Sequence, residues 1–277
     1  MIHIPREDGF LPQAVCNGIQ ISFDDTEFGS NKTPLVFLHG HGFNRSMWDY
    51  QKQVLRGSHR IITYDLRGHG RSEKPATGYG LEEEIKDLKD LLAVGKAPKA
   101  HLIGLSRGAR VALGFAAAHP NSAASVISMG AGYDIARVAP EFAEQNAQTV
   151  AMIRSEGLRA AKAYRQELPI FAPAMEKEDV AARMDQLTLS YTGAHWLDEN
   201  PPEDVSLADI VSSITAPTLI MVGERDLPGF QTCADELAEK IPEAEKRVVP
   251  GVGHMMNLEA PESMTEAIAA FVAKASV

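Results

Sequence analysis

Short apolar runs, rich in β-branched residues, recur along the chain and are separated by stretches with helical patterns. The runs lie at 34–38, 60–64, 100–105, 124–129, 217–222 and 246–250. They barely alternate between apolar and polar residues, which is typical of strands covered on both faces. The helical pattern at 81–95 repeats apolar residues on one face and ends at Gly95. Because parallel strands need such crossovers, the alternation predicts an α/β fold with a doubly wound, mostly parallel sheet.

Two regions depart from this alternation. Asn17-Gly18 stands between short apolar stretches, which predicts an antiparallel hairpin near the N-terminus. Between about Tyr133 and Ser213 the chain is rich in Ala and Glu and shows helical patterns without a convincing strand. We therefore predict an α/β core domain formed by residues 1–133 and 214–277, with a helical cap inserted at residues 134–213.

Composition excludes several classes of protein. The chain of 277 residues has 27 Lys and Arg against 37 Asp and Glu, a net charge of −10, which argues against non-specific nucleic-acid binding. Its N-terminus lacks the apolar run of a secretory signal, and no window approaches 18 uninterrupted apolar residues, so we expect a cytoplasmic protein without a membrane segment. Cys16 and Cys233 lie far apart without metal-like spacing, and we expect free, mostly buried thiols.

A serine between two glycines is the first candidate for chemistry. The stretch 101–110 contains Gly104-Leu105-Ser106-Arg107-Gly108, where an apolar strand gives way to a helical pattern. Glycines two residues before and after the serine remove Cβ atoms from a sharp turn, so Ser106 can adopt a strained backbone conformation. The following helix directs N–H groups and the positive end of its dipole toward the same point. A serine that merely caps the helix would have the same local pattern.

A serine hydroxyl needs a base near neutral pH, and histidine has a suitable pKa. His254 lies in a Gly-rich loop after the last predicted strand, where an imidazole could reach the carboxyl edge of the sheet. The imidazole in turn needs a carboxylate to fix its tautomer. Asp226 follows the strand at 217–222 and gives the order Ser, acid, His; Asp134 and Glu224 are the rival acids.

An oxyanion hole would complete the site, since its donors stabilise the charge of a tetrahedral intermediate. The backbone N–H of Arg107 is one expected donor, and the N–H of His41, in the loop after the first buried strand, is the other. His39 and His41 also have ligand-like HxH spacing. No third ligand cluster accompanies them, so we expect no metal and interpret His39 as a packed loop residue.

Five segments together resemble the α/β-hydrolase superfamily, in its branch of one-cap serine hydrolases for small substrates. They are LVFLHGHGFNRSMWDYQ, YDLRGHGRSEKP, HLIGLSRGARVAL, PTLIMVGERD and VPGVGHMMNLEAPE, in family order and nearly end to end. The resemblance implies Ser106 as nucleophile, His254 as general base and acid, and Asp226 as the residue that orients it. The amides of His41 and Arg107 would be the oxyanion donors. Arg107 departs from the family pattern, because many relatives carry an uncharged residue there.

The predicted reaction is hydrolysis of a small carboxylic ester or lactone through an acyl-enzyme on Ser106, without a cofactor. Three alternatives keep the same residues: a cofactor-free haloperoxidase or perhydrolase, a C–C bond hydrolase, and a small-molecule receptor that retains the triad. Ester hydrolysis compared with acetate-dependent bromination separates the first, and single-turnover kinetics would indicate the receptor. Haloalkane dehalogenases and epoxide hydrolases are disfavoured, since the resemblance implies an aspartate nucleophile for both.

Substrate identity should depend on the cap. We predict that His195, Trp196 and Met255 contact the substrate. Arginines of the cap and its margins, which include Arg154 and Arg165, would suit a substrate carboxylate if one faced the serine, although helical arginines usually face water. The expected partner is a small-molecule substrate, with no nucleic acid and no membrane, and a homodimer is left open.

Overall fold

The computed structural model describes residues 12–199 and 206–276. Its centre is an eight-stranded sheet with the order β1-β2-β4-β3-β5-β6-β7-β8. The strands are β1 (Gln13–Cys16), β2 (Ile19–Asp25), β3 (Leu35–Leu38), β4 (Ile61–Tyr64), β5 (Ala100–Leu105), β6 (Ala123–Met129), β7 (Thr218–Gly223) and β8 (Glu245–Val249). Each of the six predicted apolar runs is a strand, and the strands from β3 to β8 pair in parallel. The predicted α/β fold is confirmed.

The predicted hairpin is also present at the N-terminal end of the sheet. β1 and β2 pair antiparallel, and β2 pairs antiparallel with β4, which joins the hairpin to the parallel strands. Asn17 and Gly18 connect the two strands with φ values of 47° and 79°. Two consecutive positive φ angles suit the right-handed twist of a hairpin, and Asn-Gly adopts them at low cost.

β8 differs from the prediction that every strand is covered on both faces. It is the edge strand of the sheet, and only Val249 is buried, while residues 245–248 are exposed. The central strands β3, β4, β5 and β7 are buried at every position. A short apolar run cannot by itself distinguish a central strand from an edge strand, because that difference depends on the neighbours.

Helices cover the sheet on its two faces. α1 (Asp49–Leu55) packs against α12 (Pro261–Ala275), and α2 (Leu81–Val94) packs against α3 (Arg107–Ala118). α3 contacts β3, β5 and β6, and α10 (Pro228–Lys240) contacts β7 and β8. A short helix, α11 (Met256–Glu259), precedes α12. Each covering helix buries one apolar face, as the pattern at 81–95 predicted for α2, which ends next to Gly95.

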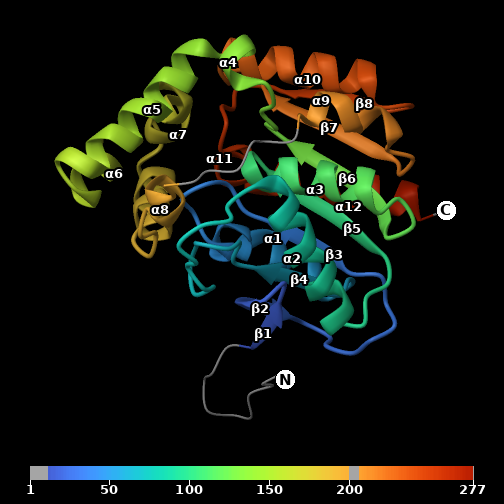
Figure 1. The fold of residues 1–277 in the computed structure, drawn as a ribbon. Coiled ribbons are helices and arrows are strands. Elements are labelled where there is room, and N and C mark those ends of the chain that lie inside the picture. The colour runs from blue at the N-terminus through green and yellow to red at the C-terminus, as the bar shows by residue number, and fades with distance from the viewer. Residues whose placement is uncertain (1–11, 200–205, 277) are drawn as a thin grey trace.

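The described part of the chain between β6 and β7 consists of helices and connecting loops without a strand, and Figure 1 shows α5 to α8 grouped beyond one end of the sheet. Its elements are α4 (Ile135–Val138), α5 (Pro140–Ser155), α6 (Leu158–Gln166), η2 (Pro169–Phe171), α7 (Ala172–Met175), α8 (Glu178–Thr188), η3 (Ala194–Leu197), α9 (Leu207–Ile210) and η4 (Val211–Ser213). A small cluster of Ile153, Ala161, Tyr191 and Trp196 packs inside it, apart from the main core. The division into a core domain and a cap at residues 134–213 stays a prediction. Residues 1–11 and 277 of the predicted core and residues 200–205 of the predicted cap lie outside the described structure.

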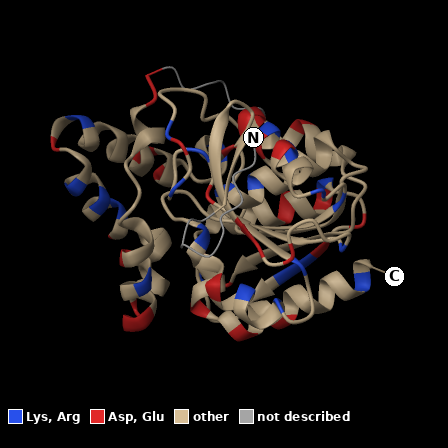
Figure 2. Cartoon of the chain, turned by 90° about the horizontal axis from the view of Figure 1, so that it is seen from below, with Lys and Arg blue, Asp and Glu red and all other residues tan. Residues whose placement is uncertain are grey.

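Charges of both signs are interspersed over the surface. Figure 2 shows Lys and Arg positions interspersed with Asp and Glu positions along the outer helices. Within the described residues, no helix is long and apolar enough to cross a membrane. Cys16 and Cys233 are free and buried, as predicted.

Candidate active site

Ser106 occupies the turn between β5 and α3. Its backbone has φ 55° and ψ −113°, outside the common regions for a residue with a side chain. Such strain persists only where the surrounding structure enforces it, and it is common at functional sites. The Ser106 N–H donates to the Met129 carbonyl at the end of β6 over 2.8 Å, which ties the turn to the neighbouring strand.

The two flanking glycines are explained by close backbone contacts. A Cβ on Gly104 would lie 2.3 Å from the Gly108 carbonyl oxygen, and a Cβ on Gly108 would lie 2.2 Å from the Leu38 carbonyl oxygen. Any larger residue would therefore force α3 away from β3 and β5. The glycines let the helix begin directly against the sheet, and the serine is left at the carboxyl edge of the strands.

The His254 imidazole pairs with the Asp226 carboxylate. Nδ1 of His254 lies 2.8 Å from Oδ2 of Asp226, and both residues are buried. Asp226 follows β7 and His254 follows β8, so the carboxyl edge of the sheet brings together two residues that are 28 positions apart. The rival acids lie elsewhere: Asp134 is exposed and pairs with Arg137, while exposed Glu224 accepts a hydrogen bond from Gly251 N–H.

Backbone and aromatic contacts connect this pair to the Ser106 turn. Gly130 follows the residue that binds Ser106 N–H, and a Cβ on it would lie 3.0 Å from His254 Cε1. The Phe230 ring packs edge-on against the His254 ring at a centroid distance of 4.7 Å, and Phe230 lines the same pocket as Ser106. With Nδ1 bonded to Asp226, Nε2 is the ring nitrogen left for proton transfer.

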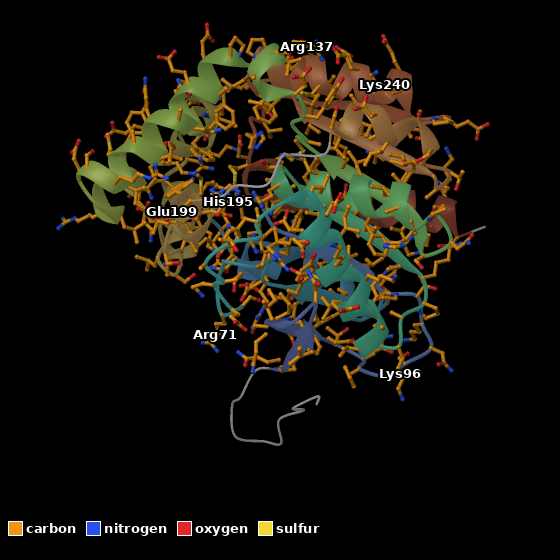
Figure 3. The ribbon with its side chains drawn as sticks, viewed as in Figure 1. Arg71, Lys96, Arg137, His195, Glu199 and Lys240 are labelled. Carbon is orange, nitrogen blue, oxygen red and sulfur yellow. The ribbon has the colours of Figure 1, made fainter. Side chains whose placement is uncertain are left out.

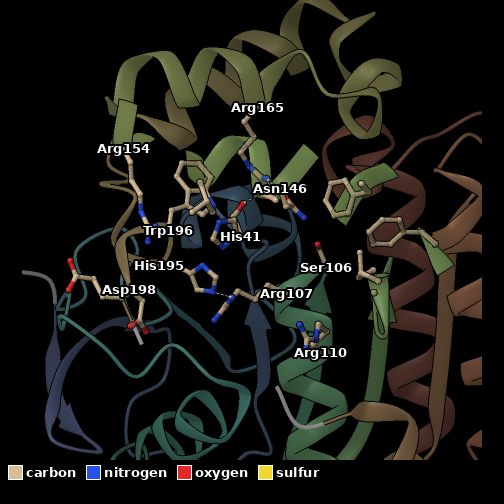
Figure 4. Close-up of a pocket in the computed structure, with 17 residues that line it drawn as sticks. His41, Ser106, Arg107, Arg110, Asn146, Arg154, Arg165, His195, Trp196 and Asp198 are labelled. Atoms are coloured by element: carbon tan, nitrogen blue, oxygen red, sulfur yellow. Dashed lines mark hydrogen bonds between the residues drawn. The ribbon is translucent and has the colours of Figure 1, made fainter. Parts of the chain in front are cut away.

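A cavity of about 440 Å³ opens above Ser106, a size typical of small-molecule sites. Figure 4 shows Ser106 pointing into it from the end of α3, with Arg165 reaching in from the opposite side. The lining is partly apolar, with Ile135, Phe142, Ala147, Val150, Trp196 and Phe230. The polar side chains that line it are His41, Ser106, Arg107, Arg110, Asn146, Arg154, Arg165, His195, Asp198 and Glu199.

The two predicted oxyanion donors both border this cavity. Arg107 is the first residue of α3, so its N–H has no acceptor within the helix. In the loop after β3, Gly40 N–H donates to Met47 Sδ (3.3 Å) and Gly42 N–H donates to His69 Nε2 (3.1 Å). The His41 N–H between them has no bonded acceptor in the part of the chain that the structure describes. The two amides keep these roles as predictions.

Backbone hydrogen bonds fix the tautomers of two histidines behind the cavity. His39 Nδ1 donates to the Gly40 carbonyl (2.8 Å), and its Nε2 accepts from Leu66 N–H (2.9 Å). His69 Nδ1 donates to the Arg67 carbonyl (2.8 Å) in the same manner. Burial lowers the pKa of His39 to about 4, so the ring is neutral at pH 7. His39 is thus a packed loop residue, and across residues 12–199 and 206–276 no cluster of His, Cys, Asp or Glu is arranged to hold a metal ion.

The Arg107 side chain connects the Ser106 turn to the wall of the cavity. Its guanidinium donates to Glu84 Oε1 (2.7 Å) and to the Tyr79 carbonyl (2.6 Å), and Nη1 lies 2.7 Å from His195 Nε2. A guanidinium can only donate, so His195 Nε2 accepts and Nδ1 carries the proton. The arginine that departs from the family pattern therefore both forms a buried ion pair and borders the pocket.

The residues predicted to contact substrate divide into two groups. His195 and Trp196 line the pocket, and Figure 3 shows His195 in the interior of the molecule, whereas Arg137 lies at its outer rim. Met255 does not line it. Its side chain is fully buried in the main core, and its N–H donates to Glu259 Oε1 (3.0 Å) at the start of α11. Proximity to His254 in sequence was misleading because the backbone turns Met255 into the core.

Sequence reasoning missed part of the pocket. Phe142, Asn146 and Val150 come from α5, where they follow one face at spacings of four, and this periodicity was the available signal. Arg110 comes from the first turns of α3. Nothing local in the sequence indicated which helix face the cavity would use.

Comparisons with known proteins find relatives along most of the chain. Residues 35–267 match the model of the alpha/beta hydrolase family. The chain is 31% identical over 256 residues to the dihydrolipoyllysine-residue acetyltransferase component of an acetoin cleaving system of Pseudomonas putida, covering 89% of this chain and 65% of that protein. It is 28% identical to 3-oxoadipate enol-lactonase 1 of Acinetobacter baylyi, over 87% of this chain and 89% of that enzyme.

Solved structures show the same likeness in three dimensions. A thermophilic esterase from Thermogutta terrifontis superposes with a TM-score of 0.79 at 26% identity, covering 96% of this chain and 98% of the esterase. The family match spans most of the chain and includes Ser106, Asp226 and His254. The chain belongs to the alpha/beta hydrolase family.

Proposed function

We propose that this enzyme hydrolyses a small carboxylic ester or lactone through an acyl-enzyme on Ser106. The observation that carries the proposal is the buried Asp226–His254 hydrogen bond of 2.8 Å beside a serine held in a strained strand-to-helix turn. Relatives named as an enol-lactonase and an esterase support an acyl-transfer reaction on such substrates. The pocket between the sheet and the helical cap would hold the substrate.

In the proposed mechanism, His254 Nε2 takes the proton of Ser106 Oγ as the oxygen attacks the carbonyl carbon. Asp226 holds the imidazole in the required tautomer and stabilises the imidazolium that forms. The N–H groups of His41 and Arg107 bind the oxyanion of the tetrahedral intermediate, each worth about 10²-fold to 10³-fold in rate. His254 then protonates the leaving alkoxide. Water, deprotonated by His254, next attacks the acyl carbonyl carbon, and the acid leaves as Ser106 Oγ takes back the proton from His254.

The proposal is tested by covalent labelling with a fluorophosphonate probe, which reports an activated serine whatever the true substrate is. We expect wild-type protein to gain one adduct at Ser106 by mass spectrometry, and Ser106→Ala to gain none. Ser58→Ala, at an exposed serine, is the matched control and should be labelled like wild type. Labelling of folded Ser106→Ala at the wild-type rate would refute the assignment.

A further inference from the structure

Arg165 is an inward-facing arginine with weak neutral partners. Its side chain extends from α6 into the pocket that contains Ser106 (Figure 4). Nη1 donates to Asn146 Oδ1 over 3.3 Å and Nη2 donates to the His41 carbonyl over 3.5 Å, both long for bonds from a charged group. The guanidinium carbon also lies 5.4 Å from the Phe171 ring centroid and 5.7 Å from that of Trp196. None of these groups carries a negative charge.

Four buried or partly buried arginines elsewhere in the described structure are paired with carboxylates, unlike Arg165. Each of four arginines has a carboxylate oxygen within 3.0 Å: Arg45 with Asp65, Arg60 with Asp25, Arg67 with Asp87 and Arg107 with Glu84. Arg165 forms no such ion pair with any residue of the described chain. The contrast within one molecule indicates that the counter-charge of Arg165 comes from elsewhere.

The lack of a counter-charge agrees with the lowered pKa of Arg165. Burial lowers the pKa of its guanidinium to about 10, and the group is still protonated at pH 7. A partly buried cation without a counter-charge is unfavourable, and a carboxylate can bind a guanidinium through two parallel hydrogen bonds. The acidic residues of the lining do not supply this charge, because neither Asp198 nor Glu199 forms an ion pair with Arg165 within the described structure, and Figure 4 shows Asp198 apart from the Arg165 side chain.

The position of Arg165 also indicates which part of the substrate it faces. Arg165 contacts His41, whose N–H is assigned to the oxyanion. His254, which must protonate the leaving group, packs instead against Phe230, and Phe230 packs against Phe142 at 5.4 Å. The wall next to His254 is thus aromatic, while Arg165 stands beside the loop of His41, and we assign the acyl part of the substrate to the Arg165 side.

We propose that the substrate is an ester or lactone whose acyl part carries a carboxylate, and that Arg165 binds this carboxylate and positions the scissile carbonyl over Ser106. The inference rests on the proposed function and names the substrate class of the same site. Arg165 acts here in binding and specificity, while the bond-breaking steps remain with Ser106 and His254.

Two p-nitrophenyl esters of matched length test the proposal: the monoester of glutaric acid, with a terminal carboxylate, and its carboxamide analogue. We expect wild-type kcat/KM to favour the carboxylate. Arg165→Gln should lower the ratio of the two kcat/KM values about tenfold to a hundredfold, the worth of a hydrogen-bonded charge. Arg165→Lys should retain part of the preference as a point charge. Arg159→Gln, at an exposed arginine on the same helix, is the control and should keep the wild-type ratio.

Labelling by the fluorophosphonate distinguishes failure of this inference from failure of the proposed function. Wild-type protein that is labelled at Ser106 but has equal kcat/KM for the two esters, unchanged in Arg165→Gln, overturns the carboxylate inference alone. Absence of labelling overturns the proposed function. A protection assay needs no variant: glutarate should slow labelling of wild-type protein more than glutaramide does, and equal effects would contradict a carboxylate site.

Discussion

On one side of the pocket, the His254 ring has its Nδ1 bonded to a buried carboxylate over 2.8 Å and its face packed against Phe230. On the other side, His41 and His195 each keep a buried Nδ1 without a hydrogen-bond partner among the described residues, and Arg165 lacks a counter-charge. The first side is complete in the protein alone. The second leaves the Nδ1–H of His195 without an acceptor and Arg165 without a counter-charge among the described residues, so a ligand with acceptor oxygens would complete it.

Under the proposed function, this contrast separates the residues of the reaction from those of substrate recognition. Burial lowers the pKa of His41 and of His195 well below the ordinary value, and neighbouring cationic groups add to the effect. Both rings are therefore neutral near pH 7, and the positive charge of this wall comes from its arginines. Changes on the His254 side should lower turnover for every substrate, whereas changes on the arginine side should depend on the substrate.

The largest expected effect tests the complete side. Asp226→Asn keeps the size of the side chain but favours the wrong tautomer of His254, and kcat should fall by about 10⁴-fold for charged and neutral esters alike. Steady-state kinetics on the ester pair measures it. Asp134→Asn is the control and should remain near wild-type activity, because Asp134 pairs with Arg137 on the surface. A large loss in Asp134→Asn with little loss in Asp226→Asn would move the acid to position 134.

A second prediction concerns Arg107, which connects the Ser106 turn to His195 on the other side of the pocket. Arg107→Met would leave the buried Glu84 carboxylate without its cation, and the free energy of unfolding should fall by about 3–5 kcal/mol. The backbone N–H at 107 remains, so turnover should fall far less than in Asp226→Asn. Chemical denaturation measures the loss of stability. The double variant Glu84→Gln, Arg107→Met should recover part of it, and a double variant no more stable than the single one would show that the ion pair is not the cause.

The smallest expected effect is a pH dependence of the free energy of unfolding, caused by the buried neutral histidines His39 and His69. Burial holds the pKa of His39 at about 4 and that of His69 well below 6.5. As pH falls from 6.5, the unfolded chain binds protons at these rings and the folded chain does not, so the free energy of unfolding decreases. Each ring contributes a slope of up to about 1.4 kcal/mol per pH unit. Urea titrations between pH 7.5 and 5 should show it, and His39→Gln should have a shallower slope; identical slopes would contradict the assignment.

Much of the sheet, its covering helices and the Ser106 turn could be predicted, because the sequence signals for them are local. Strands buried on both faces require continuous apolar runs, and the crossover helices require amphipathic ones, so the order of elements is readable. The turn at Ser106 was recognisable because Gly104 and Gly108 are needed by backbone contacts that no other residue permits. The pairing of Asp226 with His254 followed from the rule that parallel strands present their carboxyl ends at one edge.

The side of the pocket formed by Arg107, Arg165 and His195 could not be predicted in this way. Arg107 and His195 are 88 positions apart, and no local pattern joins them. Arg165 lies on a helix whose orientation is decided by packing over the sheet, and arginines on helices usually face water. Met255 was misplaced for a related reason, because its neighbour His254 reaches the site while its own side chain enters the core.

The exposed edge strand β8 has a consequence for self-association. Lys246 pairs with Asp235 and Glu245 pairs with Lys274, so charged, partnered side chains accompany the free backbone edge. A second copy that added a strand there would have to displace or crowd these ion pairs. If this hydrolase dimerises, an intermolecular β-ladder along β8 should not supply the contact.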